Sequence, residues 1–293
     1  MDNLLTAERT TYRPLECRPD SYQGWYRQGN IHWQSGRVEE ALLCFNRALE
    51  YHPEDYWTWY KQAMAYEKLG FPHEAIDSYA QACNICPKNY WSWYDQGCLF
   101  MEKLGKYDRA IACFEKALED HPEDYWSNYR LGECWRLLEK YARALSYYDK
   151  ALTFRPNDYW SWYRRGDALL AWDKPEVALT SYDRALEVKP GDFWAWYQRG
   201  QTLEELEHYT NAIESFEQAL VDIPKDADTW YEQAYCFAKI GNFEEAFNSL
   251  EAAIQLDPEI YFPDAEDDMC FAEMWRMARW DDLNDLYDEF MAE

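Results

Sequence analysis

The sequence has no long apolar run and little glycine or proline. Its apolar stretches fall well short of the roughly 18–20 residues that a helix needs to cross a bilayer. Its first residues also lack the basic and then apolar pattern of a secretion signal. Glycine occurs 11 times and proline 12 times in 293 residues, which argues against a low-complexity chain. We therefore expect a folded protein in the cytoplasm, without direct membrane insertion.

Basic residues are also scarce. The 29 lysines and arginines stand against 55 aspartates and glutamates, so the formal net charge is −26. Nucleic acids and anionic lipids would repel such a chain over most of its surface. The charge thus favours partners that are neither nucleic acid nor membrane.

Motifs of enzymes and metal sites are missing. The sequence contains no G-x-x-x-x-G-K, G-x-G-x-x-G, G-x-S-x-G or H-E-x-x-H pattern. Its nine cysteines are odd in number and scattered, which fits reduced thiols better than disulfides. Cys83 and Cys86 form a lone C-x-x-C pair that no second pair or spaced histidine pair completes to a zinc set. We expect no catalytic activity, no metal and no cofactor.

Aromatic residues are abundant and recur at a fixed interval. They make up 18% of the chain, with 16 tryptophans and 25 tyrosines. A Trp-Tyr pair, with Asn128 replacing the tryptophan once, returns every 34 residues, with one step of 35 between the third and fourth. The tyrosines of these seven units are Tyr26, Tyr60, Tyr94, Tyr129, Tyr163, Tyr197 and Tyr231.

Small residues and prolines recur with the same step. Two alanine series and one proline series have one member in each of the seven units. The first alanine series is Ala41, Ala75, Ala110, Ala144, Ala178, Ala212 and Ala246. The second is Ala48, Ala82, Ala117, Ala151, Ala185, Ala219 and Ala253, and the prolines are Pro53, Pro87, Pro122, Pro156, Pro190, Pro224 and Pro258.

Each unit is predicted to form two helices. In the third unit, Trp93, Gly97 and Phe100 are spaced by four and three residues and so share one face of a first helix. Gly105 supplies a turn, and Pro122 ends the second helix. Alanines between the helices allow a close approach. Neither helix buries its apolar face alone, so neighbouring units must stack.

This pattern resembles the tetratricopeptide repeat (TPR), a 34-residue helix-turn-helix unit, and its Trp-Tyr-x-Arg/Gln-Gly run is similar to cyanobacterial members of that family. The resemblance implies an all-α, right-handed α-solenoid of seven tandem repeats with a helical C-terminal cap. The chain departs from the family three positions after the tryptophan, where leucine is usual. Here stand Gln28, Gln62, Gln96, Leu131, Arg165, Arg199 and Gln233.

The repeat step also divides the chain. We expect an N-terminal arm or degenerate cap over residues 1–20 and an acidic helical cap over 260–293. In the cap, residues 264–278 and 280–291 are predicted to form two helices. Residues 226–293 hold 19 acidic and three basic residues, a net charge of −16. They act either as a plain cap or as a docking element for a basic partner. The seven repeats are predicted at 21–54, 55–88, 89–123, 124–157, 158–191, 192–225 and 226–259.

The first helix of each repeat has a second aromatic face. In the third unit it carries Trp91, Tyr94, Cys98 and Met101, spaced by three, four and three residues. The family resemblance implies that this face lines a concave groove that binds a partner segment. The candidate groove residues are Trp57, Tyr60, Trp91, Tyr94, Trp126, Tyr129, Arg130, Trp160, Tyr163, Arg164, Trp194 and Tyr197.

Two alternatives remain open at these residues. The tryptophans either line the groove or pack between repeats, whereas the tyrosines are expected to turn their hydroxyls to the groove. The arginines Arg130, Arg164 and Arg165 either pair with acids of the chain or capture an acidic group of a partner.

The sequence therefore predicts a non-catalytic scaffold, adaptor or assembly factor that binds a partner protein or peptide. One alternative is a regulatory or substrate-recruiting subunit of an enzyme on another chain. Another is a binder of glycans or other small ligands that stack on aromatic rings. The sequence does not predict an oligomeric state.

Overall fold

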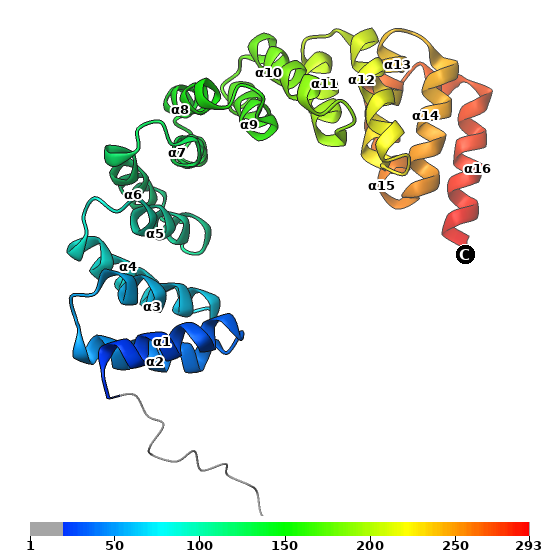
Figure 1. The fold of residues 1–293 in the computed structure, drawn as a ribbon. Coiled ribbons are helices and arrows are strands. Elements are labelled where there is room, and N and C mark those ends of the chain that lie inside the picture. Colours follow the sequence, from blue (N-terminus) through cyan, green and yellow to red (C-terminus); the bar gives the residue numbers. More distant parts are fainter. Residues whose placement is uncertain (1–19, 293) are drawn as a thin grey trace, which may run out of the picture. The chain divides into compact units, whose positions relative to one another are not determined.

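The computed structural model describes the backbone of residues 20–292 and the side chains of residues 20–290. The expected N-terminal arm lies outside the described residues, apart from Asp20. The chain divides into two compact units at Pro122 and Glu123, and each is described by itself. Unit 1 contains α1 (Tyr22–Gln34), α2 (Val38–Tyr51), α3 (Tyr56–Lys68), α4 (Pro72–Ile85), α5 (Tyr90–Glu102) and α6 (Tyr107–Asp120) (Figure 1).

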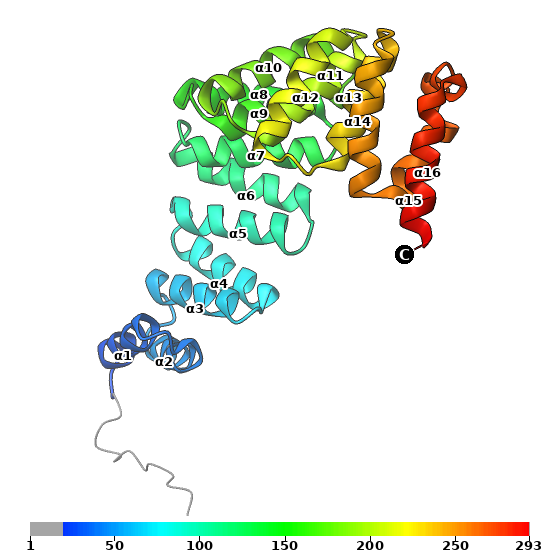
Figure 2. The same ribbon diagram turned by 90° about the vertical axis from the view of Figure 1, so that its right-hand side faces the viewer.

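Unit 2 contains four helix pairs and the cap (Figures 1 and 2). The pairs are α7 (Tyr125–Leu137) and α8 (Tyr141–Phe154), α9 (Tyr159–Leu170) and α10 (Pro175–Val188), α11 (Phe193–Glu205) and α12 (Tyr209–Asp222), and α13 (Ala227–Lys239) and α14 (Phe243–Leu256). The cap is α15 (Pro258–Asp267), the 3-10 turns Met269–Phe271 and Met274–Arg276, and α16 (Ala278–Ala292).

Within each unit, consecutive helices pack as antiparallel pairs, and each pair packs on the next. Residues 20–292 contain no strand. The predicted all-α solenoid of tandem helix-turn-helix repeats with a helical C-terminal cap is confirmed.

After α1, which begins at Ser21, the first helix of each pair begins at an acidic or amide side chain. Asp158 accepts a hydrogen bond from the backbone N of Ser161 at 2.7 Å, and Asp124 accepts one from Ser127 N at 2.6 Å. Each bond satisfies one of the amides that a helix start leaves unpaired.

The core of each repeat lies between its two helices. Ala144, Ala178 and Ala212 are fully buried, and so are the rings of Tyr148 and Tyr182 beside them. The small alanines let the paired helices approach, and the rings fill the remaining space. The two predicted alanine series therefore form the inner faces of the second helices.

In five of the repeats a tryptophan of the first helix donates a hydrogen bond to the loop before it. The indole N–H of Trp162 donates to the carbonyl of Pro156 at 2.7 Å, and that of Trp196 donates to the carbonyl of Pro190 at 2.6 Å. Trp230 donates in the same way to Pro224 at 3.0 Å. This bond orients the ring and explains why tryptophan and proline recur together.

The polar residues that depart from the family pattern bridge neighbouring repeats. Gln62 Nε2 donates to Asn46 Oδ1 of α2 at 2.7 Å, and Gln62 Oε1 accepts from the Ser78 hydroxyl of α4 at 2.7 Å. Gln62 is only 7% exposed. The side chain thus reaches neither open solvent nor a partner but connects the second helices of two repeats.

The cap covers the apolar end of the last repeat. Phe271 and Met274 are fully buried, and Trp280 packs against Phe247 of α14 with 6.4 Å between ring centroids. The prediction of one helix over 264–278 was wrong. Instead α15 ends at Asp267, and the Asp268 carboxylate accepts from Cys270 N at 2.8 Å and starts a 3-10 turn.

Candidate functional site

Three tryptophans at the second position of consecutive first helices are half exposed in unit 2. Trp126 of α7, Trp160 of α9 and Trp194 of α11 have exposed fractions of 47%, 53% and 58%. We call these three residues the indole row. Since buried tryptophan is the norm for a repeat core, their exposure separates them from the packing tryptophans such as Trp162.

The rings of the indole row share one orientation. Each stands edge-on against the aromatic ring of the residue before it, with centroids about 5 Å apart. Of those preceding rings, Tyr125 and Phe193 are buried at 5% and 4% exposure. Tyr159, which precedes Trp160, is partly buried. The preceding ring therefore supports each indole from one side and leaves it about half exposed.

Unit 1 repeats the arrangement twice. Trp57 of α3 and Trp91 of α5 are 52% and 56% exposed, and each contacts the preceding ring of Tyr56 or Tyr90 edge-on. In both units this tryptophan set is therefore about half exposed, as expected for a set that lines a groove.

The tyrosines of the predicted groove are more enclosed than the tryptophans. Tyr163 is 8% exposed, and its ring lies 5.8 Å from that of Tyr182 on α10. The Tyr60 hydroxyl donates to Asp95 Oδ2 at 2.6 Å. Burial raises the pKa of Tyr129 and Tyr163 to about 12. The Tyr60 hydroxyl is thus bound by an acid of the next repeat, and the Tyr163 ring packs on the second helix of its own repeat.

The remaining tyrosines follow the same pattern. The ring of Tyr94 lies 5.6 Å from that of Phe114, and Tyr129 lies 6.1 Å from Tyr148. The ring of Tyr197 lies 6.0 Å from that of Phe216. These contacts join the first helix of each repeat to the second.

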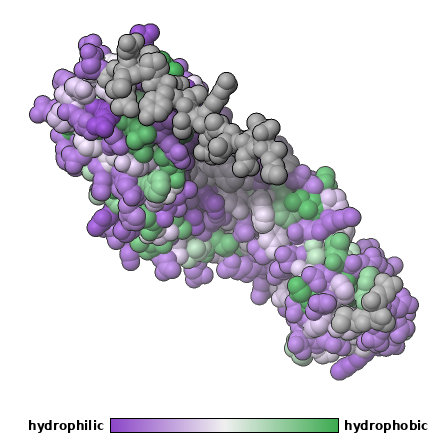
Figure 3. Space-filling model, turned by 90° about the horizontal axis from the view of Figure 1, so that it is seen from below, coloured by the Kyte–Doolittle hydropathy of each residue, from purple (hydrophilic) through white to green (hydrophobic). Residues whose placement is uncertain are grey.

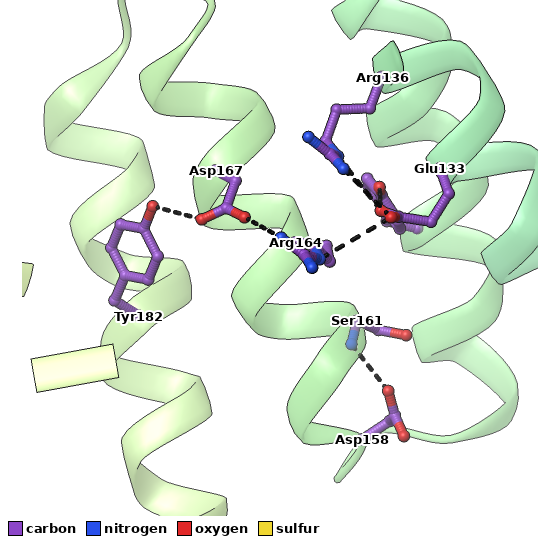
Figure 4. A network of polar contacts seen from close by, with 8 residues as sticks. Glu133, Arg136, Asp158, Ser161, Arg164, Asp167 and Tyr182 are labelled. Atoms are coloured by element: carbon purple, nitrogen blue, oxygen red, sulfur yellow. Dashed lines mark hydrogen bonds and ion pairs between the residues drawn. The ribbon is translucent and has the colours of Figure 1, made fainter. Parts of the chain in front are cut away.

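The predicted groove arginine Arg164 belongs to a network of internal ion pairs (Figure 4). Its Nη1 lies 2.9 Å from Asp167 Oδ2, and its Nε lies 3.8 Å from Glu133 Oε2. Arg136 also pairs with Glu133 at 3.2 Å, and the Tyr182 hydroxyl donates to Asp167 at 3.0 Å. The geometry therefore favours internal pairing of Arg164 over capture of an acidic group.

The other two arginines differ in position. Arg130 lies half-buried on α7, one position after Tyr129. Arg165 pairs with Asp149 at 2.8 Å on the side of α9 that faces the second helices. It therefore does not belong to the predicted groove face.

Partly buried acids lie on the first helices of several repeats. Burial raises the pKa of Asp95 to about 6. Burial, together with the neighbouring charge of Glu232 on α13, raises the pKa of Glu204 on α11 to about 8. Asp95 and Glu232 come one residue after the recurring tyrosine, so the 34-residue register locates both in the sequence, whereas it gives no signal for Glu204.

Residues 20–290 hold no group of three or more His, Cys, Asp or Glu side chains placed to bind a metal ion. The eight described cysteines are free thiols. In the part of the chain that the structure describes, every helix is too short or too polar to cross a membrane.

Tandem helix pairs with exposed aromatic rows define a helical-repeat protein. The chain belongs to the tetratricopeptide repeat family. One family model described as tetratricopeptide repeat matches residues 94–159, 163–227 and 197–259. Two further models of the same description match residues 22–55 and 58–89. No curated protein matches the chain by sequence.

Solved structures share the fold at low identity. The C-terminal part of a TPR repeat-containing protein from Cytophaga hutchinsonii aligns over 83% of this chain and 100% of its own, with 17% identity and a TM-score of 0.70. YrrB, described as a TPR protein with an unusual peptide-binding site, aligns over 66% of this chain and 100% of its own, with 24% identity and a TM-score of 0.58. MamA aligns over 58% of this chain and 92% of its own, with 18% identity and a TM-score of 0.55.

Proposed function

We propose that the chain is a non-catalytic scaffold, adaptor or assembly factor, and that unit 2 holds an extended segment of a partner protein along its indole row. The observation that carries the proposal is the shared orientation and half exposure of Trp126, Trp160 and Trp194. The repeat fold supports it, since the related structure of YrrB is described as having a peptide-binding site.

The spacing of the row fits an extended polypeptide. In unit 2, α7, which carries Trp126, contacts α9, which carries Trp160. Packed helices lie about 8–10 Å apart, so one indole follows the next at about that distance. An extended polypeptide in the polyproline II form advances about 3.1 Å per residue with about three residues per turn, so every third side chain of the partner would meet an indole.

The chemistry of the row fits an apolar or aromatic partner side chain at those contacts. An exposed indole offers a large apolar face together with an N–H donor, which is why tryptophan contributes strongly to binding at interfaces. The preceding aromatic ring already contacts each indole edge-on. Little side-chain freedom is therefore lost on binding.

Charge narrows the class of partner. A net charge of −26 opposes nucleic acid and anionic lipid, so we propose a protein partner. On the face that Figure 3 shows, hydrophilic residues cover most of the surface and apolar residues form separate patches. The free thiols fit a reducing cytoplasm, which we propose as the compartment.

The test is affinity capture with matched variants. The double variant Trp160→Ala/Trp194→Ala removes two of the three indoles of the row. The control Trp172→Ala removes an exposed tryptophan outside the row. We expect proteins that wild type and Trp172→Ala retain to be lost from the double variant at unchanged helical content. Equal retention by the double variant, or capture of glycans in place of any protein, would contradict the proposal.

A further inference from the structure

Two arginines of unit 2 occupy a repeated kind of place between second helices. The guanidinium of Arg199 lies 2.7 Å from Asp183 Oδ1 on α10 and 2.6 Å from Ser215 Oγ on α12. It also lies over the ring of Trp196, 5.5 Å from its centroid. A carboxylate, a hydroxyl and an aromatic face thus surround one guanidinium.

Arg165 repeats these contacts one repeat earlier. Its guanidinium lies 2.8 Å from Asp149 and 2.6 Å from the Ser181 hydroxyl, and 5.7 Å from the ring centroid of Trp162. The two arginines therefore show that this place in the fold suits a guanidinium group, which is planar and both pairs with carboxylates and stacks on rings.

The last repeat keeps this lining but lacks the arginine. Gln233 stands at the equivalent position, while Glu217 and Ser249 stand 16 residues before and after it, as Asp183 and Ser215 do for Arg199. Trp230 provides the ring, held by its own bond to the preceding proline carbonyl.

A cavity of about 460 Å³ lies where the arginine would be. The Gln233 side chain turns to Ser249, whose hydroxyl donates to Gln233 Oε1 at 2.8 Å. Within residues 20–290, Glu217 forms no ion pair. No basic residue of the described chain lines the cavity. Its lining residues are Glu217, Leu220, Val221, Trp230, Gln233, Phe237, Glu245, Asn248 and Ser249.

We propose that this cavity binds the guanidinium group of an arginine side chain supplied by a partner protein. The guanidinium would lie over Trp230 and pair with Glu217, in the manner of Arg199 with Trp196 and Asp183. Charge complementarity supports a basic partner, because residues 226–293 carry a net charge of −16.

The cavity is distinct from the indole row. Asp228 takes the row position in α13, and Trp230 follows two residues later, which is about 200° around the helix. The nearest cap arginine, Arg279, is already engaged, since its Nη2 donates to Asn248 Oδ1 at 2.6 Å and lies 3.4 Å from Glu251 Oε2. The inference therefore goes beyond the proposed function and can fail independently of it.

The first test uses the full chain with ¹⁵N-labelled tryptophan and a capped Gly-Arg-Gly tripeptide. We expect the tripeptide to shift the Trp230 indole N–H signal saturably, and the neutral citrulline analogue to leave it unchanged. An equal shift by the citrulline analogue would overturn the proposal. Free arginine that binds more tightly than the tripeptide would overturn the assignment to a polypeptide.

Two variants of the chain test the cavity directly: one occupies it with an arginine side chain, and the other removes its carboxylate. Gln233→Arg supplies the missing guanidinium in cis, so it should abolish the saturable shift and raise Tm. Glu217→Gln removes the exposed carboxylate and should weaken binding at least tenfold, even where Gln233→Arg fails to fold. Undiminished binding to either folded variant would overturn the proposal.

A third variant should create the same kind of cavity in the preceding repeat. Arg199→Gln should open an equivalent cavity in the preceding repeat, lined by Trp196, Asp183 and Ser215. We expect the arginine tripeptide then to shift the Trp196 indole signal as well, which it does not do in the wild type. A folded Arg199→Gln protein without that new response would show that the lining alone does not recognise a guanidinium.

Discussion

A Cβ atom added to Gly166 of α9 would lie 2.6 Å from Cε1 of Tyr182, in the second helix of the same repeat. That distance is well inside van der Waals contact, so the buried ring must move. In Gly166→Ala, overpacking should cost about 1–3 kcal/mol of unfolding free energy. The higher helix propensity of alanine offsets about 1 kcal/mol of that cost. Urea unfolding measures the difference.

The matched control is Gly191→Ala. A Cβ atom at Gly191 has no neighbour within 4 Å, and its backbone φ is not positive. Its free energy of unfolding should therefore stay within about 0.5 kcal/mol of wild type. Equal stability of both variants would contradict the packing that we describe between α9 and α10.

Tyr163 and Trp160 lie one helical turn apart and should respond differently to truncation. Tyr163 is buried, so Tyr163→Ala should cost about 3–5 kcal/mol. Trp160 is 53% exposed and contacts the ring of Tyr159 edge-on, so Trp160→Ala should cost about 1 kcal/mol. Thermal unfolding of both variants checks the order, and the reverse order would place the tyrosine in the groove.

The charged network of Figure 4 depends on Glu133. This carboxylate is 8% exposed and pairs with both Arg136 and Arg164. Glu133→Ala should destabilise the protein by at least about 2 kcal/mol, because two partly buried arginines lose a partner. Asp149→Ala breaks a more exposed pair and should cost less than about 1 kcal/mol. Similar losses in denaturant melts would show that burial does not matter here.

The Glu204 carboxyl makes stability depend on pH. Its folded pKa of about 8 lies above its ordinary value of 4.5, so the folded state binds the proton more tightly than the unfolded state. This contribution is complete below pH 4.5 and is lost as the pH rises to about 8. Wild type should therefore lose more stability between pH 5 and pH 8 than Glu204→Gln.

Tm measured across that range tests this prediction, with Glu205→Gln as the control. Glu205 is the exposed neighbour of Glu204 on α11, so its variant should follow wild type. Glu232, Lys239 and Asp268 also act on Glu204, and their charges set the size of the effect. Parallel curves for wild type and Glu204→Gln would contradict the account.

The helix pairs were predictable because their determinants are local and recur. An N-cap such as Asp158, a turn glycine such as Gly105 and the alanines at Ala144 and Ala151 each favour the same fold in every unit. The cap was less predictable, since it lacks the repeat. There Asp268 ends one helix and starts a 3-10 turn, which periodicity does not reveal.

The candidate site was predictable only in part. Helical spacing places Trp160 and Tyr163 on one face, but it does not say how far each is covered. The distinction arises from the second helix, where Tyr182 packs on Tyr163 and leaves Trp160 exposed. Glu204 was missed because its proximity to Glu232 depends on the stacking of two repeats.

The most direct test of the proposed function uses a binding segment from a partner protein found by affinity capture. Its affinity is compared between the wild type and the double variant Trp160→Ala/Trp194→Ala. Calorimetric titration gives both dissociation constants. Truncated aromatic anchors often cost about 2 kcal/mol each, so we predict at least about a tenfold loss of affinity, equivalent to roughly 1.4 kcal/mol. Unchanged affinity of a folded double variant would contradict the claim that the indole row binds the partner.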